Sequence, residues 1–371
     1  MFVFVCARCD AELTTPLSQV ALPVHAHQQY GNGIQLPVLM ESGTFAVDPE
    51  PWGPPWRPWQ ELGPGEAEAR GIHAPVHALS DGAPGAVVIA PGDVRGTRMI
   101  PERQGGSCCG LDGSDGPNMA CAACGLPVAS RVDDCSAWQA VWLAPDAVRR
   151  LPAGDADPAP LSWEELVEEG ESTPPLEPIA TWGGKRSETG HFWSWSPRWE
   201  AAAGRALAHL LAASQGRSVT VPDGLAADVF RRALDTLLPA GPPQRRAVLA
   251  GPGLPALDAD ADADILLVPV HPQTGRTWAP AGPAASACPV PLPLGVWLWM
   301  AFPQPGAPRP ATGRLPHDVL RDDPPPPRPT SLFRADRGTF QNTLVRLPAV
   351  RRPWLRTILE SLAEDRTSSL F

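Results

Sequence analysis

The segment GGSCCGLDGSDGPNMACAACG, residues 105–125, holds four of the chain's eight cysteines in a run rich in glycine and aspartate. Such a run offers few apolar side chains for a hydrophobic core. Its thiols could bind a metal, form disulfides, supply a nucleophile, or have no chemical role. The positions of the other cysteines narrow these alternatives.

The end of this segment repeats a pattern from the N-terminus. CARCDAEL begins at Cys6 and CAACGLPV begins at Cys121, and each is Cys-x-x-Cys followed by Asp or Gly and then by an apolar residue. Two thiolates three positions apart can bind one ion when the chain turns tightly and its amides point at the sulfurs. A residue that tolerates a left-handed conformation after the second cysteine lets the turn close.

Both stretches resemble the metal knuckles of zinc-ribbon and treble-clef proteins. The resemblance implies one closed site in which four thiolates share a zinc ion: Cys6, Cys9, Cys121 and Cys124. The chain departs from those proteins in the long insert between the pairs, residues 10–120. Loop-closure entropy grows only logarithmically with length, so this insert is compatible with a shared ion.

Three further cysteines in the N-terminal region, Cys108, Cys109 and Cys135, keep several possible roles. One of the adjacent pair could replace a knuckle ligand, join Cys135 and a histidine around a second metal, or act as a nucleophile beside a base. The histidines available for these roles are His25, His27, His73 and His77. We favour the simpler interpretation that each histidine is a surface or hydrogen-bonded side chain.

Composition favours short elements and many turns. The 371 residues allow two domains, 43 % of them are hydrophobic, and 48 prolines and 34 glycines are present. A net charge of −10 argues against binding nucleic acid over the whole surface. Residues 328–356 carry seven arginines and one aspartate, and this segment either binds nucleic acid or, as we favour, is solvated or lies against the acidic remainder of the chain.

No feature indicates export or a membrane. The N-terminal MFVFVCARCD lacks the basic region of a signal peptide, and the most apolar segment, residues 291–302, is too short to span a bilayer. We therefore expect a cytoplasmic protein without a membrane partner. Its thiols would stay reduced, which makes disulfides the less favoured interpretation of the cysteines.

We expect an α+β protein in five segments. Residues 1–150 form a loop-rich, mainly β domain with the zinc, and residues 151–180 an acidic, proline-rich linker. Residues 181–302 form a smaller α+β domain. Residues 303–330 run extended, and residues 331–371 form a strand and an amphipathic helix.

Hydrophobic periodicity and end signals predict the elements within these segments. Helices are expected within residues 162–169, 196–216, 223–241 and 351–366. Short strands are expected within residues 1–5, 85–96, 217–221, 264–270 and 294–302. Residues 48–59, with five prolines and three tryptophans, are expected to form an irregular loop.

These features predict a binding or interaction protein with a structural zinc and a protein or small-molecule partner. One alternative is a hydrolase or transferase that uses a second metal or an exposed cysteine in the N-terminal domain. A second alternative is nucleic-acid binding through the arginine-rich segment. The number of protein ligands distinguishes the structural zinc from a catalytic metal. Four thiolates close a tetrahedral site, whereas three ligands and a water leave a catalytic position open.

Overall fold

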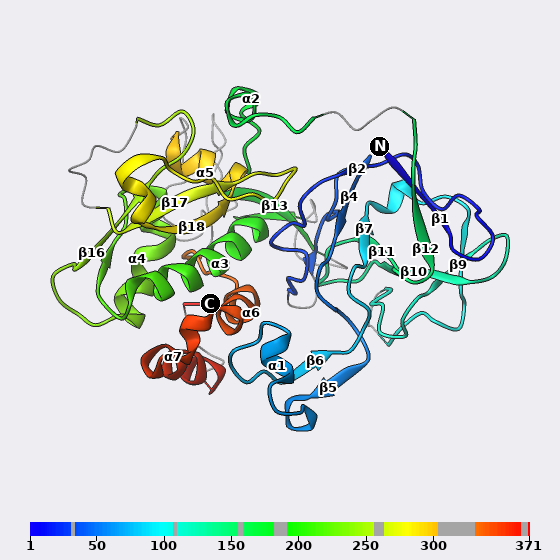
Figure 1. The fold of residues 1–371 in the computed structure, drawn as a ribbon, viewed down its shortest axis with the longest axis horizontal. Coiled ribbons are helices and arrows are strands. Elements are labelled where there is room, and N and C mark those ends of the chain that lie inside the picture. The colour runs from blue at the N-terminus through cyan, green and yellow to red at the C-terminus, as the bar shows by residue number, and fades with distance from the viewer. Residues whose placement is uncertain are drawn as a thin grey trace, which may run out of the picture.

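The computed structural model describes residues 1–30, 34–106, 110–154, 159–181, 191–255, 263–302, 331–364 and 370–371. These residues form an α+β fold, as the sequence predicts (Figure 1). The proline-rich segment 303–330 lies outside the described residues, and so do Cys108 and Cys109. None of the helices in the described parts of the chain combines the length and the apolar character that crossing a bilayer requires.

The N-terminal part is built on a seven-stranded sheet. In sheet order its strands are β2 (Ser18–Gln19), β4 (Thr44–Val47), β7 (Val87–Ile89), β11 (Ala140–Leu143), β10 (Pro127–Val132), β9 (Met119–Cys121) and β8 (Thr97–Met99). The first strand, β1 (Phe2–Cys6), pairs antiparallel with β12 (Val148–Pro152). Phe4 of β1 is buried with Phe45 and Leu143 of the seven-stranded sheet in one hydrophobic cluster.

The C-terminal part is built on four parallel strands that follow chain order in space. They are β15 (Val219–Thr220), β16 (Arg245–Leu249), β17 (Ile265–Val270) and β18 (Cys288–Pro293). The predicted helices are present as α2 (Trp163–Glu169), α3 (Pro197–Ser214), α4 (Leu225–Leu237) and α7 (Pro353–Glu364). Helix α3 is the centre of this part, because the exposed fraction of Trp199, Leu207 and Leu210 is at most 1 %.

Three sequence predictions are wrong in kind. Residues 294–302 hold a helix, α5 (Leu294–Ala301), because a short, uniformly apolar run has no period that separates a buried strand from a buried helix. The strand expected after residue 331 is helix α6 (Arg337–Arg346), which Asp336 caps by accepting a hydrogen bond of 2.6 Å from the Thr339 amide. The irregular loop 48–59 contains strand β5 (Trp56–Pro58), which pairs with β6 (Ala78–Ser80).

The insert between the two knuckles reaches the C-terminal core. Its hairpin β5–β6 encloses α1 (Glu66–Ala69), and both lie beside α6 and α7 in Figure 1. Ile72 and Leu79 from this stretch belong to the same hydrophobic cluster as Leu207. The domain boundaries stay a prediction, but residues 67–79 pack with the C-terminal half.

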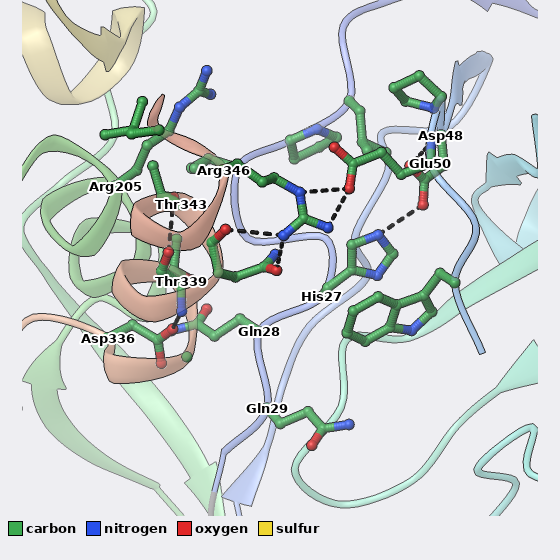
Figure 2. Close-up of a pocket in the computed structure, with 18 of the residues that line it drawn as sticks. His27, Gln28, Gln29, Asp48, Glu50, Arg205, Asp336, Thr339, Thr343 and Arg346 are labelled. Carbon is green, nitrogen blue, oxygen red and sulfur yellow. Dashed lines mark hydrogen bonds and ion pairs between the residues drawn. The ribbon is translucent and has the colours of Figure 1, made fainter. Parts of the chain in front are cut away.

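A second connection between the halves is a small antiparallel sheet. Strand β3 (Ile34–Gln35) pairs with β13 (Leu176–Thr181), which pairs with β14 (His191–Trp195). A pocket of about 680 Å³ lies between residues 22–29 and 48–52 on one side and helices α3 and α6 on the other (Figure 2). The pocket is therefore walled by both halves of the chain.

Candidate metal centre

The two Cys-x-x-Cys stretches fold into matching turns. Strand β1 ends at Cys6 and strand β9 ends at Cys121. In the first turn the Cys6 amide donates to the Ala11 carbonyl at 2.9 Å, and the Asp10 amide donates back to the Cys6 carbonyl at 3.0 Å. The second turn repeats both bonds, from Cys121 to Leu126 at 2.8 Å and from Gly125 to Cys121 at 2.9 Å.

The residue after each second cysteine closes its turn as the sequence predicts. Asp10 has φ +60° and Gly125 has φ +76°, which is the left-handed region. Glycine takes this conformation without steric cost, and aspartate is among the few other residues that tolerate it. Arg149 on β12 forms an ion pair with Asp10 and so ties the first turn to the sheet.

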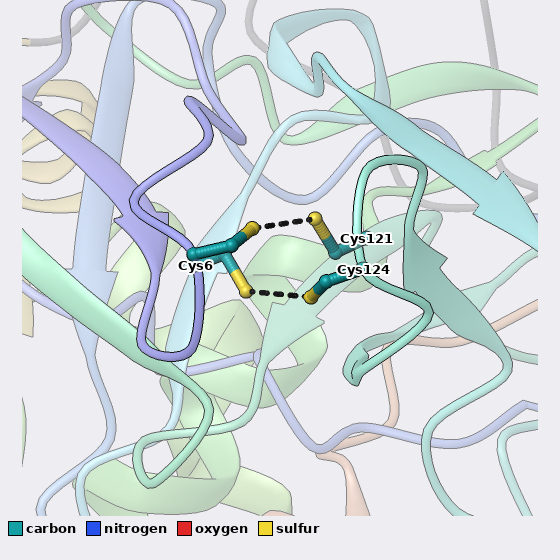
Figure 3. Close-up of side chains that lie close together, drawn as sticks. Cys6, Cys121 and Cys124 are labelled. Carbon is teal, nitrogen blue, oxygen red and sulfur yellow. Dashed lines mark hydrogen bonds between the residues drawn. The ribbon is translucent and has the colours of Figure 1, made fainter.

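The turns bring four sulfurs together at one point. The ligand atoms of Cys6, Cys9, Cys121 and Cys124 all lie within 4.8 Å of one another. The Cys6 and Cys124 sulfurs are 3.5 Å apart, and the Cys9 and Cys121 sulfurs are 3.7 Å apart. Figure 3 shows the sulfurs of the two turns facing each other. Zinc–sulfur bonds of about 2.3 Å in a tetrahedron place sulfurs about 3.8 Å apart, so these residues fit a zinc ion.

The electrostatics of the cluster also suit a cation. Burial opposes ionisation of the Cys6 thiol, but the amides of Arg8 and Cys9 donate to its sulfur and lower its pKa to about 7. For Cys9, the Ala11 amide acts in the same direction, yet the neighbouring sulfurs outweigh it and raise the pKa to about 12. Four thiolates this close repel one another unless a positive charge lies among them.

The cluster lies at the edge of the N-terminal core. Cys6 and Cys121 are fully buried beside Phe4 and Leu13, Cys124 is half-buried, and Cys9 is exposed. An ion here would join the first strand of the chain to the β9–β10 hairpin.

The other sequence candidates do not join this group. Cys135 is buried but lies outside the four-sulfur cluster, which is the one group of potential metal ligands found among the described residues. His25 packs on Trp138 with ring centroids 4.3 Å apart. His73 accepts a hydrogen bond of 3.1 Å from Arg351, and His77 is exposed. His73 and His77 agree with the simpler interpretation of the histidines. His25 does not, because it is buried and its Nε2 has no hydrogen-bond partner among the described residues.

His27 is hydrogen-bonded, as the simpler interpretation expects, and it also lines the pocket of Figure 2. Its Nε2 lies 2.8 Å from Asp48 Oδ2, and its ring stacks on Trp52 with centroids 3.9 Å apart. Sequence reasoning did not bring these residues together, nor did it find Arg205 and His209 across the pocket. The available signal was the four-residue spacing of Arg205 and His209 in the mainly apolar stretch of α3 that follows Glu200.

The arginine-rich C-terminal segment faces the N-terminal half. Arg346 Nε donates to Glu50 at 2.7 Å, and Arg351 lies 2.9 Å from Glu68. Arg356 donates to the His73 carbonyl at 3.0 Å. These contacts agree with the expectation that the segment lies against acidic parts of the same chain.

Comparisons with protein-family models, curated proteins and solved structures return no match to this chain. Its function must therefore be argued from the geometry of its own residues.

Proposed function

We propose that the four-cysteine cluster holds one structural zinc ion in a binding or interaction protein. The observation that carries this proposal is the pair of matching turns whose four sulfurs converge at tetrahedral spacing. Soft thiolate ligands in a tetrahedron favour zinc over the oxygen-preferring cations.

A structural role is favoured over a catalytic one. Four thiolates fill the tetrahedron, so no position is left for a water or a substrate. Cys6 and Cys121 are also buried beneath the N-terminal core. An ion in this place links β1 to the β9–β10 hairpin.

The need for reduced thiol ligands supports a location in the cytoplasm. Four thiolates remain available to a metal only where thiols are kept reduced, so we propose that the protein works in the cytoplasm. Its partner would be a protein or a small molecule. Nucleic-acid binding is not favoured, because Arg346 and Arg351 already pair with Glu50 and Glu68.

Metal analysis of protein purified without added zinc tests the proposal. We expect one zinc per chain, with X-ray absorption reporting four sulfur ligands at about 2.3 Å. Cys121→Ser should lose the metal. Cys288→Ser is the matched control, since Cys288 lies on β18 outside the cluster, and it should keep the full equivalent. Metal-free protein that folds normally, or metal retained by Cys121→Ser, would reject the proposal.

A further inference from the structure

Two basic side chains of α3 face the pocket between the halves. Arg205 and His209 are four residues apart and so lie on one face of the helix, and both line the pocket. Gly204 makes this placement possible, because a Cβ there would lie 2.4 Å from the Asp336 carbonyl. Helices α3 and α6 therefore touch at Gly204, and the next residue, Arg205, emerges beside α6 (Figure 2).

Neither Arg205 nor His209 has a hydrogen bond or an ion pair to any residue that the structure describes. Burial lowers the pKa of the Arg205 guanidinium, which nevertheless stays protonated in proteins. Arg205 is half-buried. Even a partly buried charge without a partner is costly, and native proteins normally pair such groups. The arrangement indicates that Arg205 meets an anion from outside the chain.

The other charged residues around the pocket already have partners. Asp48 is bonded to His27 and accepts from the Glu50 amide at 3.0 Å. Glu50 is paired with Arg346. The Asp336 carboxylate accepts a hydrogen bond from the Thr339 amide as the cap of α6, and Figure 2 shows it below Arg205 on the same side of the view. Among the charged side chains of the described lining, Arg205 is thus the one without a hydrogen-bond or ion-pair partner.

The single unpaired charge of Arg205 indicates a ligand with one negative charge. We propose that this pocket binds a small organic monocarboxylate, with its carboxylate on Arg205 and His209 and its apolar body along the opposite wall. A guanidinium matches one carboxylate in a bidentate pair. A dianion such as a phosphate monoester would bring a second negative charge, for which the described lining has no further unpaired cation.

The remaining lining suits the apolar body. Leu22, Val24, Trp52 and Leu347 contribute apolar surface. The volume of about 680 Å³ is within the range of small-molecule sites. Burial, and then the charge of Arg205, lowers the pKa of His209 to about 4, so at neutral pH its imidazole is uncharged and can donate one N–H.

This inference gives a ligand class to the binding role proposed above. It rests on that role and not on the metal, because the four cysteines lie outside the pocket lining. The two proposals can therefore fail separately.

The test uses the full chain and three probes: benzoate, phenylacetate and hexanoate. Binding is measured by calorimetry and by the shift in melting temperature, with benzyl alcohol and phenyl phosphate as uncharged and dianionic comparisons. We expect saturable binding of at least one probe. Arg205→Met should weaken it by at least about tenfold, because it removes a charge-assisted hydrogen bond. Arg205→Lys should restore part of the affinity.

Arg217→Met is the matched control, since Arg217 is exposed near the end of the same helix and outside the pocket. It should bind the probes as the unmodified chain does. Without a probe, Arg205→Met should melt no lower than the unmodified chain, whereas a merely structural arginine would lower the melting temperature when removed. Zinc content, measured on every variant, should stay unchanged.

Three results would overturn the inference: no binding of any of the three carboxylates, affinity of Arg205→Met within twofold of the unmodified chain, or equal binding of benzyl alcohol or phenyl phosphate. Carboxylate binding by protein that contains no zinc would leave the inference standing and reject the structural metal instead.

Discussion

The sulfurs of Cys9 and Cys121 lie 3.7 Å apart although the two residues are 112 positions apart in the sequence. Each comes from a turn that its own backbone bonds define. Residues 95 and 96 connect the two turns through backbone hydrogen bonds to Leu13 and Ala122. An ion shared by the four sulfurs would join the turns directly and so close a long stretch of chain. A structural zinc contributes on the order of 10 kcal/mol in small peptides, which is comparable to the stability of a whole domain.

Chelation should therefore loosen the N-terminal sheet and leave the C-terminal core folded. Trypsin should make new cuts after Arg98 on β8 and Arg131 on β10, whose strands adjoin β9. Arg70 should stay protected, because its hairpin packs on the C-terminal core and its guanidinium donates to Asp81. Limited proteolysis with and without chelator measures this.

Adding zinc back is the control and should restore the original cutting pattern. An unchanged pattern after the metal has demonstrably been removed means that the ion is not structural. Cutting after Arg70 as early as after Arg98 means that the C-terminal core does not hold the insert.

Gly125 should be the most sensitive non-cysteine position of the second turn. Its φ of +76° costs any residue with a Cβ about 1–2 kcal/mol. Gly125→Ala should lower the free energy of unfolding by about that amount in a denaturant titration. Gly92→Ala is the control, since Gly92 has ordinary φ and open space around it, and it should change little. Equal effects would show that the turn conformation is not what Gly125 supplies.

The four-cysteine cluster could be predicted from sequence because each half of it is local. Two cysteines three apart, followed by Asp10 or Gly125, specify a turn without reference to the rest of the chain. Helix α3 could be predicted for the same reason, from Pro197 at its start and a regular apolar period. The parallel sheet order and the docking of residues 67–79 depend on distant contacts, and no local pattern encodes them.

The elements that were missed lack a local signal. Helix α5 has no polar face, because Val296, Trp297 and Leu298 are all buried. Helix α6 contains weak helix formers and depends on the Asp336 cap and on packing against α3. The pocket joins residues 22–29 and 48–52 to α3 and α6, so its charges could be matched only after the chain had folded.

The contact between α3 and α6 predicts that two glycine substitutions change the free energy of unfolding in opposite directions. Gly204→Ala should lower the free energy of unfolding by about 1–3 kcal/mol, because its Cβ would meet the Asp336 carbonyl at 2.4 Å and neither backbone can yield easily. Gly338→Ala, in the first turn of α6, has only an ordinary contact of 3.5 Å and should raise stability by up to about 1 kcal/mol. Thermal and denaturant unfolding of both variants measure this, and a stabilising Gly204→Ala would contradict the close approach of the helices.

His25 should make the protein less stable in mild acid. Burial, and then the positive charge of Arg198, lowers the pKa of His25 to about 3, against about 6.5 in an unfolded chain. Between these values the unfolded state binds the extra proton, so stability falls as the pH drops below about 6.5 and this loss levels off near pH 3. From pH 7 to pH 5 the loss from this one group is about 2 kcal/mol. His25→Phe, which can keep the ring contact with Trp138, should reduce the decrease by about that amount relative to the unmodified chain. Denaturant titrations of both proteins at the two pH values measure the difference.

Exposed His77 is the control position, and His77→Phe should leave the pH dependence unchanged. Parallel pH profiles for His25→Phe and the unmodified chain would show that His25 does not titrate as its burial requires.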